Sequence, residues 1–352
     1  MARVAVSAYA EIDVDVNNDD GRVEEGLLRS SASPVAICII ASLGLWSADA
    51  SAQNYPVKPI RMLFGSTAGS GAGDMSARLL AQKMGEMLGQ NVVVDNRPGA
   101  GGAIADEAAV RAPADGYTLL YAAGASAILP ALRPKLPYNI ERHLAPVSLV
   151  VITSFALSLH PSVPVNDVKS LIALARSQPR KLTFGSPGVG SSAHFAGELF
   201  NMMSGVRMLH VPYKGPAEAT TALVGGEIDV AFPSVTAALP LIGVGKLKTL
   251  AVSSARRAPL LPSVPTIEEA GLPGYARAGW NGVLVPAATP KEIIAKLNTA
   301  IVKGINTPET KEAFTKIGIE AQTGTPEHFA AFIRSELAQN AKVIKFAGIK
   351  VE

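Results

Sequence analysis

The sequence carries two glycine-rich stretches, Gly65-Ser66-Thr67-Ala68-Gly69-Ser70-Gly71-Ala72-Gly73-Asp74 and Gly185-Ser186-Pro187-Gly188-Val189-Gly190-Ser191-Ser192. Each follows an apolar run that predicts a strand and precedes residues at helical spacing. The first N–H groups of a helix lack partners within it, and together with the positive end of the helix dipole they favour an anion. Two such turns, about 120 residues apart, indicate two halves that close on one small anionic ligand. Each turn taken alone is equally compatible with an ordinary tight connection.

The residues around the first turn predict an α/β fold. Strands are expected at 60–64, 91–94 and 117–122, and they alternate with helices over 74–88 and 103–111. This alternation argues for a mainly parallel sheet flanked by helices. Ligands of such sheets bind outside the carboxyl ends of the strands, where both glycine-rich turns fall.

The same alternation returns in the middle of the chain. Strands are expected at 182–185, 208–211 and 228–232, with helices over 191–204 and 217–223. The last segment is long enough to rejoin the first unit. We therefore expect one domain of residues 53–153 plus 278–352 and a second of residues 154–277. The chain would cross between them near 151–155 and near 275–281.

The composition is that of an ordinary globular protein with a mild positive charge. The chain has 352 residues, of which 48% are hydrophobic and 5% aromatic, and its net charge is +3. After residue 52 the balance is +8, which suits anionic ligands. No block of basic residues with interleaved aromatics occurs, so nucleic acid is not expected as a partner.

The N-terminal region predicts export. The apolar run 34–46 is too short to span a bilayer, and it is followed by Ala50-Ser51-Ala52, a small-residue cleavage pattern. We expect a signal region over 1–52, cleavage after Ala52 and a periplasmic chain that begins at Gln53. Ile37 before Cys38, the single cysteine, does not fit a lipid-anchor motif.

The stretch 1–33 before the apolar run is longer and more acidic than the start of an ordinary signal peptide. One hypothesis is that translation starts downstream, near Leu27 or Leu28. A cytoplasmic protein with an acidic tail is the alternative.

Glycine-rich turns serve three known chemistries, and the sequence discriminates among them. The first turn contains no lysine, which excludes a phosphate-binding P-loop, and the chain has no G-x-S-x-G nucleophile motif. A dinucleotide site would need a small residue where Asp74 stands, yet Asp95 ends the next strand, where a ribose-binding acid would lie. A nicotinamide-cofactor enzyme is therefore the rival interpretation. The histidine and cysteine spacings predict no metal site, and we expect no cofactor.

Some polar residues near the turns have simpler structural explanations. His194 would brace the second turn, Asp74 would complement the N-terminus of its helix, and Arg97 would form a salt bridge. We keep His194 and Asp74 as candidate ligand contacts beside these explanations.

At these residues the sequence resembles the substrate-binding proteins of tripartite tricarboxylate transporters, the Bug receptors. The resemblance covers 55–352. It is carried by the segments Asp95-Asn96-Arg97-Pro98-Gly99-Ala100-Gly101-Gly102, Asp115-Gly116-Tyr117-Thr118-Leu119-Leu120, Ala193-His194-Phe195-Ala196-Gly197-Glu198-Leu199-Phe200, His210-Val211-Pro212-Tyr213-Lys214-Gly215 and Phe329-Ala330-Ala331-Phe332-Ile333-Arg334.

The resemblance implies a two-domain clamshell of the type II periplasmic-binding-protein kind, without enzymatic activity. Such a monomer would capture a small carboxylate through backbone N–H groups of two loops and deliver it to membrane permease subunits. A ligand-sensing partner of a membrane kinase, or an NAD(P)-binding oxidoreductase, is the alternative function. The candidate ligand-binding residues are Ser66, Thr67, Ala68, Gly69, Ser70, Gly71, Asp74, Ser126, Gly188, Gly190, Ser191, Ser192, His194, Ser234 and Trp280.

Two departures from the family pattern bear on the ligand. The first loop lacks the usual prolines and is one residue longer, so its contacts do not transfer atom for atom. After Phe232 the family often has an acid or amide, whereas this chain has Pro233-Ser234. The missing acid disfavours amino acids and favours plain mono- to tricarboxylates or an aromatic acid.

Overall fold

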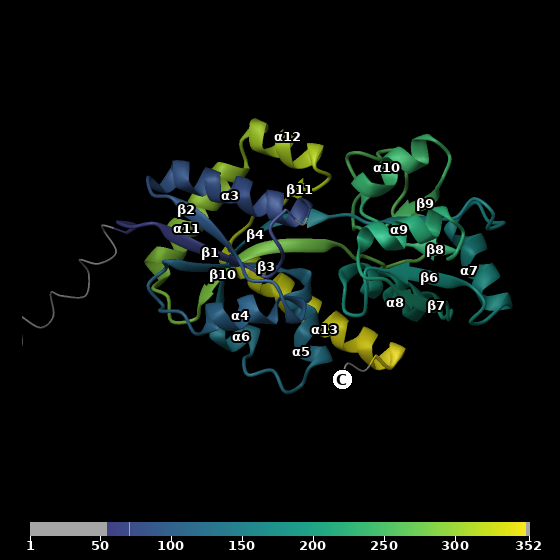
Figure 1. The fold of residues 1–352 in the computed structure, drawn as a ribbon, viewed down its shortest axis with the longest axis horizontal. Coiled ribbons are helices and arrows are strands. Elements are labelled where there is room, and N and C mark those ends of the chain that lie inside the picture. The colour runs from purple at the N-terminus through teal and green to yellow at the C-terminus, as the bar shows by residue number, and fades with distance from the viewer. Residues whose placement is uncertain (1–54, 70, 350–352) are drawn as a thin grey trace, which may run out of the picture. The chain divides into compact units, whose positions relative to one another are not determined.

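The computed structural model describes residues 55–69 and 71–349, so the predicted signal region and Ser70 lie outside the described residues. The chain forms two separate mixed sheets, each with helices on both faces (Figure 1). The first sheet has the order β11-β4-β10-β3-β1-β2 and comprises β1 (Ile60–Phe64), β2 (Val92–Asn96), β3 (Thr118–Ala123), β4 (Leu144–Thr153), β10 (Gly279–Pro286) and β11 (Glu320–Ala321).

The second sheet has the order β7-β6-β8-β5-β9. It comprises β5 (Ala156–Leu159), β6 (Thr183–Ser186), β7 (Leu209–Pro212), β8 (Val230–Ala231) and β9 (Lys248–Val252). Long connections and helices separate its strands: α7 (Val168–Ser177), α8 (Ser192–Ser204), α9 (Pro216–Val224) and α10 (Val235–Gly243).

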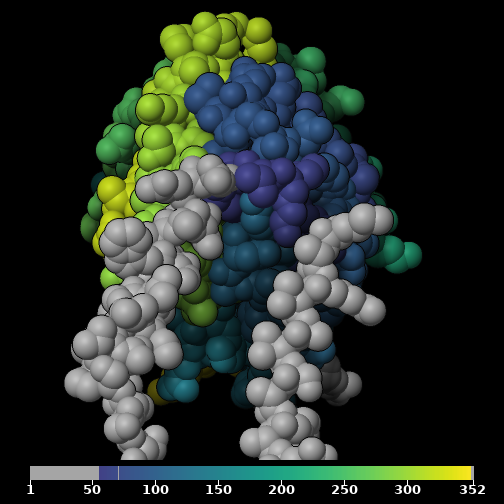
Figure 2. All heavy atoms as spheres, turned by 90° about the vertical axis from the view of Figure 1, so that its left-hand side faces the viewer, coloured from purple at the N-terminus to yellow at the C-terminus, as the bar shows by residue number. Residues whose placement is uncertain are grey.

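The helices associated with the first sheet come from both ends of the described chain. They are α3 (Ala72–Leu88), the short 3-10 turn η1 (Ala100–Gly102), α4 (Ala103–Val110), α5 (Gly124–Leu132), α6 (Ile140–His143), α11 (Lys291–Ile305), α12 (Pro308–Lys316) and α13 (Pro326–Ala347). Figure 2 shows the yellow-green spheres of α11 against the blue spheres of α3, two helices that share one face of this sheet.

The α/β fold with two units is confirmed, but the expectation of mainly parallel sheets is wrong. Strand β1 is parallel to β2 and β3, and β6 is parallel to β7 and β8. Strand β10, in contrast, is antiparallel to both β3 and β4, and β5 is antiparallel to β8 and β9. The physical reason is that the chain leaves the first sheet along β4 and comes back along β10, so these neighbouring strands run in opposite directions.

Both faces of the first sheet are buried, which explains its nearly continuous apolar strands. In β1, Met62 and Phe64 pack into the core beneath α3 and α11, whereas Leu63 faces the core beneath α4 and α13. This alternation follows from the two-residue period of a strand. In β3, Tyr121 and Leu120 divide between the same two cores.

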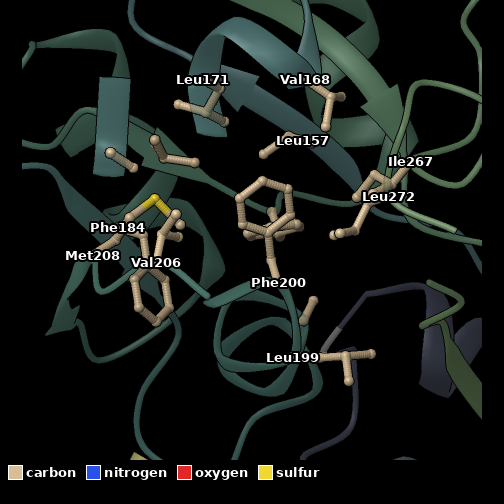
Figure 3. Close-up of a cluster of buried hydrophobic side chains, with 14 of the residues drawn as sticks. Leu157, Val168, Leu171, Phe184, Leu199, Phe200, Val206, Met208, Ile267 and Leu272 are labelled. Atoms are coloured by element: carbon tan, nitrogen blue, oxygen red, sulfur yellow. The ribbon is translucent and has the colours of Figure 1, made fainter. Parts of the chain in front are cut away.

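The core of the second sheet is centred on aromatic side chains. Phe184 from β6 and Phe200 from α8 lie among leucines and valines contributed by α7 and β5 (Figure 3). The opposite face is covered by α9 and α10 through small side chains such as Ala222 and Ala238.

The last helix takes part in two cores. Near its start, Phe329 and Ile333 pack on the first sheet, and near its end Val343 packs into the core of the second. Between them, Asn340 donates to the Ala127 carbonyl of α5 over 2.9 Å. The predicted domain division assigned all of this helix to the first domain, and it did not anticipate that Val343 serves the second core.

Candidate functional site

The first glycine-rich turn joins β1 to α3, and the carboxylate of Asp74 fixes its shape through a hydrogen bond. Gly69 and Gly71 have φ angles of 73° and 94°, which only glycine adopts readily. The N–H of Gly69 donates to Asp74 Oδ2 over 2.9 Å, and Arg78 Nε donates to the same oxygen over 2.8 Å. Thr67, Ala68 and Gly69 remain exposed to solvent.

The side chain of Asn96, at the end of β2, supports this turn, although the sequence did not single it out. Its Nδ2 lies 2.9 Å from Asp74 Oδ1 and 2.9 Å from the Ser66 carbonyl oxygen, and it donates to both. Burial opposes the charge on Asp74, but the hydrogen bonds from Gly69, Arg78 and Asn96 lower the pKa of this carboxyl below its usual value. Asp74 thus braces the turn from its position in the first turn of α3.

The second turn joins β6 to α8 and is held by three side chains of its own region, those of Ser186, Ser191 and His194. Gly190 has a φ of 87°, and its N–H donates to His194 Nδ1 over 3.3 Å. Ser191 is the N-cap of α8, with its Oγ accepting from the His194 N–H over 3.2 Å. Gly188, with a φ of 118°, donates to Ser186 Oγ over 3.2 Å.

Two imidazoles lie behind this turn, a buried one from His194 and a half-buried one from His210. The rings of His194 and His210 are stacked with centroids 3.9 Å apart, and His210 Nε2 is hydrogen-bonded to Ser186 Oγ over 2.7 Å. Burial, with the neighbouring His210 as a second cause, lowers the pKa of His194 to about 3, and burial alone lowers the pKa of His210 to about 4. Both rings are therefore neutral at neutral pH, and His194 Nδ1 can act as the acceptor that Gly190 requires.

A pocket of about 260 Å³ lies at the carboxyl ends of the second sheet. Three helices begin at its wall: α8 after Ser191, α9 at Pro216 and α10 after Ser234. Ser234 caps α10, with its Oγ accepting from the Ala237 N–H over 3.3 Å. The predicted residues Ser191, Ser192 and Ser234 are brought together here.

The lining of this pocket is apolar and hydroxylic. Five described lining residues are aromatic or proline: Phe155, Phe232, Pro187, Pro216 and Pro233. Four carry a hydroxyl group: Ser191, Ser192, Thr220 and Ser234. The others are Gly185, Ala193, Ala219 and Ala231, so none of the described lining residues has a charged side chain.

The start of α5, which belongs to the first sheet's side of the molecule, approaches the N-terminus of α8 beside the pocket. A methyl group added to Gly124 would lie 2.8 Å from Ser192 Oγ and 3.6 Å from Trp280 Nε1. A methyl group added to Gly190 would lie 3.0 Å from a methyl of Leu132, at the other end of α5. Trp280 and Ser192, both predicted, therefore flank Gly124, which was not predicted.

Two predicted residues have their polar groups engaged away from the pocket. Ser126 Oγ donates to Asp106 Oδ1 over 3.0 Å, and Trp280 Nε1 donates to Glu336 Oε2 over 3.0 Å. Burial raises the pKa of Asp106 to about 6. Ser66, Thr67, Ala68, Gly69, Gly71 and Asp74 are not among the described residues that line the pocket.

Asp95, on which the nicotinamide interpretation relied, pairs with Arg97, whose Nη2 lies 3.1 Å from Oδ2, as the salt-bridge explanation of Arg97 expected. Across 55–69 and 71–349, no group of three or more histidine, cysteine, aspartate or glutamate side chains is placed to hold a metal ion. In the same residues no helix has the length and apolar character needed to cross a membrane.

The two sheets and the crossing strands have the two-domain arrangement of the periplasmic-binding-protein fold class. The model of the tripartite tricarboxylate transporter family receptor matches residues 76–349, and the chain belongs to this family. The expected resemblance to the Bug receptors is thereby confirmed. Members of this family are substrate-binding receptors.

Three relatives illustrate the similarity. Protein BugT of Bordetella pertussis is 35% identical over 315 residues, which cover 89% of this chain and 96% of BugT. The structure of R. palustris Rpa4515 with adipate has a TM-score of 0.72 at 36% identity, covering 84% of this chain and 99% of that one. MatC from Rhodopseudomonas palustris with bound malate has a TM-score of 0.69 at 29% identity, covering 82% of this chain and 100% of MatC.

Proposed function

We propose that this chain is a periplasmic receptor that captures a small carboxylate and delivers it to the permease subunits of a tripartite tricarboxylate-type transporter. The observation that carries the proposal is the uncharged pocket at which α8, α9 and α10 begin. Helix N-termini provide unpaired N–H groups and a positive potential, so an anion can be held there without a basic side chain. Two solved relatives hold adipate and malate, which are both carboxylates.

Binding would be completed by closure of the two units. The first turn, exposed and braced by Asp74, belongs to one unit, and the pocket belongs mainly to the other. We propose that closure brings the first turn over the ligand and excludes water from the carboxylate. Serine hydroxyls at the pocket can donate to the ligand, because Ser191 and Ser234 use their Oγ atoms as acceptors for the helix caps.

The test is a thermal-shift screen followed by calorimetry on the chain that begins at Gln53. A ligand present at 100 times its Kd should stabilise the receptor by about 2.7 kcal/mol. We expect one saturable site per monomer, with no turnover of the ligand. If no carboxylate raises the Tm while NAD does, the receptor proposal fails.

Export and delivery need their own measurements. N-terminal sequencing of the periplasmic protein should find Gln53 as the first residue. Uptake of the carboxylate by cells or vesicles that contain the permease should require added receptor. Uptake that proceeds equally without the receptor would contradict the proposed partner.

A further inference from the structure

We propose that Asp106 is a positioning residue for ligand capture, because its carboxylate holds the start of α5 in place through Ser126. This proposal rests on the proposed function, since it concerns a helix that borders the pocket without lining it. Asp106 lies in the first turn of α4 and is 2% exposed, and Ser126 lies in the first turn of α5. Ser126 Oγ donates to Asp106 Oδ1 over 3.0 Å. Neither residue is among the described residues that line the pocket.

The carboxyl of Asp106 is fixed from two sides. Tyr138 Oη donates to its second oxygen, Oδ2, over 3.0 Å. Burial raises the pKa of Asp106 to about 6, although the hydrogen bonds from Ser126 and Tyr138 act to lower it. The group is therefore ionised at pH 7.5, and an ionised carboxylate accepts hydrogen bonds but cannot donate them. Both hydroxyls must then point at Asp106, which sets the direction of the bond from Ser126.

The start of α5 depends on such a bond because its own backbone holds it weakly. The N-cap residue is Ala123, whose methyl group cannot accept a hydrogen bond from the first turn. Pro130 lies inside the helix and has no N–H to donate to the carbonyl of Ser126, four residues before it. A negative charge beside the first turn also complements the helix dipole. Asp106 thus supplies from α4 the support that α5 lacks.

The position of α5 matters because both of its ends contact the second glycine-rich turn. At the start of α5, a methyl group added to Gly124 would lie 2.8 Å from the Oγ of Ser192, which lines the pocket. At the end of α5, Leu132 lies 3.0 Å from the position of a methyl group added to Gly190. No space is left for α5 to shift toward the turn, and a shift away from it would open the border of the pocket.

A separate contact keeps the middle of α5 in place when Asp106 is changed. Asn340 Nδ2 of α13 donates to the Ala127 carbonyl over 2.9 Å, and the side chain of Ala127 packs in the core beneath α13. Loss of the bond between Asp106 and Ser126 should therefore displace the start of the helix without unfolding it.

Trp280 provides a direct report on the start of α5. The chain has two tryptophans, Trp46 and Trp280, so the receptor that begins at Gln53 has Trp280 alone. Its indole is 2% exposed, and its Nε1 lies 3.6 Å from the position of a methyl group added to Gly124. Displacement of α5 should admit water to this indole and shift its fluorescence emission to longer wavelength.

The experiment measures Trp280 emission and calorimetric affinity at pH 7.5 in the receptor that begins at Gln53. The probes are adipate and malate, which two solved relatives hold. Ser126→Ala and Asp106→Ala should each shift the emission and weaken probe binding by about tenfold. Asp106→Asn keeps a carbonyl oxygen that can accept from Ser126, and Tyr138 can turn its hydroxyl to accept from the new amide. This variant should show wild-type emission and an affinity within about threefold of the wild type.

Tyr138→Phe is the matched control, because it also removes one hydroxyl from Asp106 but lies outside α5. It should lower the Tm while it leaves the emission unshifted and the affinity within about threefold of the wild type. Wild-type emission or wild-type affinity in Ser126→Ala would overturn the proposal, and so would equal losses of affinity in Ser126→Ala and Tyr138→Phe. Ser126→Ala removes only one hydroxyl, so the test does not depend on whether Asp106→Ala folds.

The proposed function and the positioning role fail in different ways. If neither these probes nor any other carboxylate binds the wild type, the receptor function fails, while the emission of Ser126→Ala still shows whether Asp106 holds α5. If carboxylates bind equally well to the wild type and to Ser126→Ala, the receptor function stands and the positioning role is wrong.

Discussion

His194 and His210 stack with their ring centroids 3.9 Å apart, and each ring holds one group of the second glycine-rich turn. His194 Nδ1 accepts from the Gly190 N–H, while His210 Nε2 is bonded to Ser186 Oγ. The turn therefore depends on neutral imidazoles. Protonation of His194 Nδ1 would remove the acceptor, and protonation of either ring would place a charge in a buried or half-buried site.

The first prediction concerns pH. Burial lowers the folded-state pKa of His194 to about 3 and of His210 to about 4, below the ordinary value of 6.5. The unfolded chain thus binds more protons, so the stabilisation is complete above pH 6.5 and is lost as pH falls toward 4 and 3. Urea unfolding between pH 7 and 4 should show a falling midpoint, with a shallower fall in His210→Gln. His328→Gln, at an exposed position, should keep the wild-type slope; identical slopes in all three proteins would contradict the assignment.

The second prediction concerns Asn96. Replacement by alanine removes the donor that Asp74 Oδ1 and the Ser66 carbonyl oxygen share. We expect a loss of about 1–2 kcal/mol in the free energy of unfolding and a several-fold weaker ligand affinity, because the first turn loses its fixed shape. Denaturant titration and calorimetry measure the two effects. Asn91→Ala, at an exposed position before β2, is the control and should change neither quantity.

The third prediction tests the contact between the two units. Gly124→Ala places a methyl group 2.8 Å from Ser192 Oγ, so the Ser192 hydroxyl must turn away from its position at the pocket or the two helices must separate. We expect weaker binding, by about tenfold, with little change in Tm, since the added methyl acts at the contact and not in a core. Gly243→Ala, which meets nothing within 4 Å, is the matched control. Full affinity in Gly124→Ala would show that this approach is not needed for binding.

The fourth prediction concerns Glu336 in α13. Its carboxylate accepts from Arg277 Nη1 and from Trp280 Nε1, each over 3.0 Å, and Arg277 is 3% exposed. Glu336→Ala would leave the buried guanidinium without its anionic partner, at a cost of about 3–5 kcal/mol. Thermal unfolding should show the loss, whereas Glu327→Ala in the exposed first turn of the same helix should cost only a few tenths of a kcal/mol. Replacing Arg277 and Glu336 together by methionine and leucine should recover part of the stability.

Sequence patterns predicted the elements whose periodicity is local. The strand at 60–64 coincides with β1, and the helix predicted over 191–204 with α8, because each has a strong apolar pattern. Helix α5 was missed, since Pro130 and a run of small residues obscure its helical pattern. The antiparallel return of β10 was missed because strand direction depends on the whole path of the chain.

The residues of the candidate site were likewise predicted where a local pattern marks them and missed where their role depends on distant partners. Ser191, Ser192 and Ser234 were predicted from helix starts and lie together at the pocket. Asn96 and Gly124 were missed because their roles arise from partners far away in sequence, Asp74 and Ser192. No local pattern encodes such a pairing.

Helix α13 completes two cores, with Phe329 in one and Val343 in the other. Since Val343 belongs to the final turns of the described chain, neither half can finish its interior early in synthesis. The emerging polypeptide therefore stays short of its native state until nearly all of it has been made. Such delayed folding would suit the export proposed above, because an exported chain crosses the membrane before it acquires its structure.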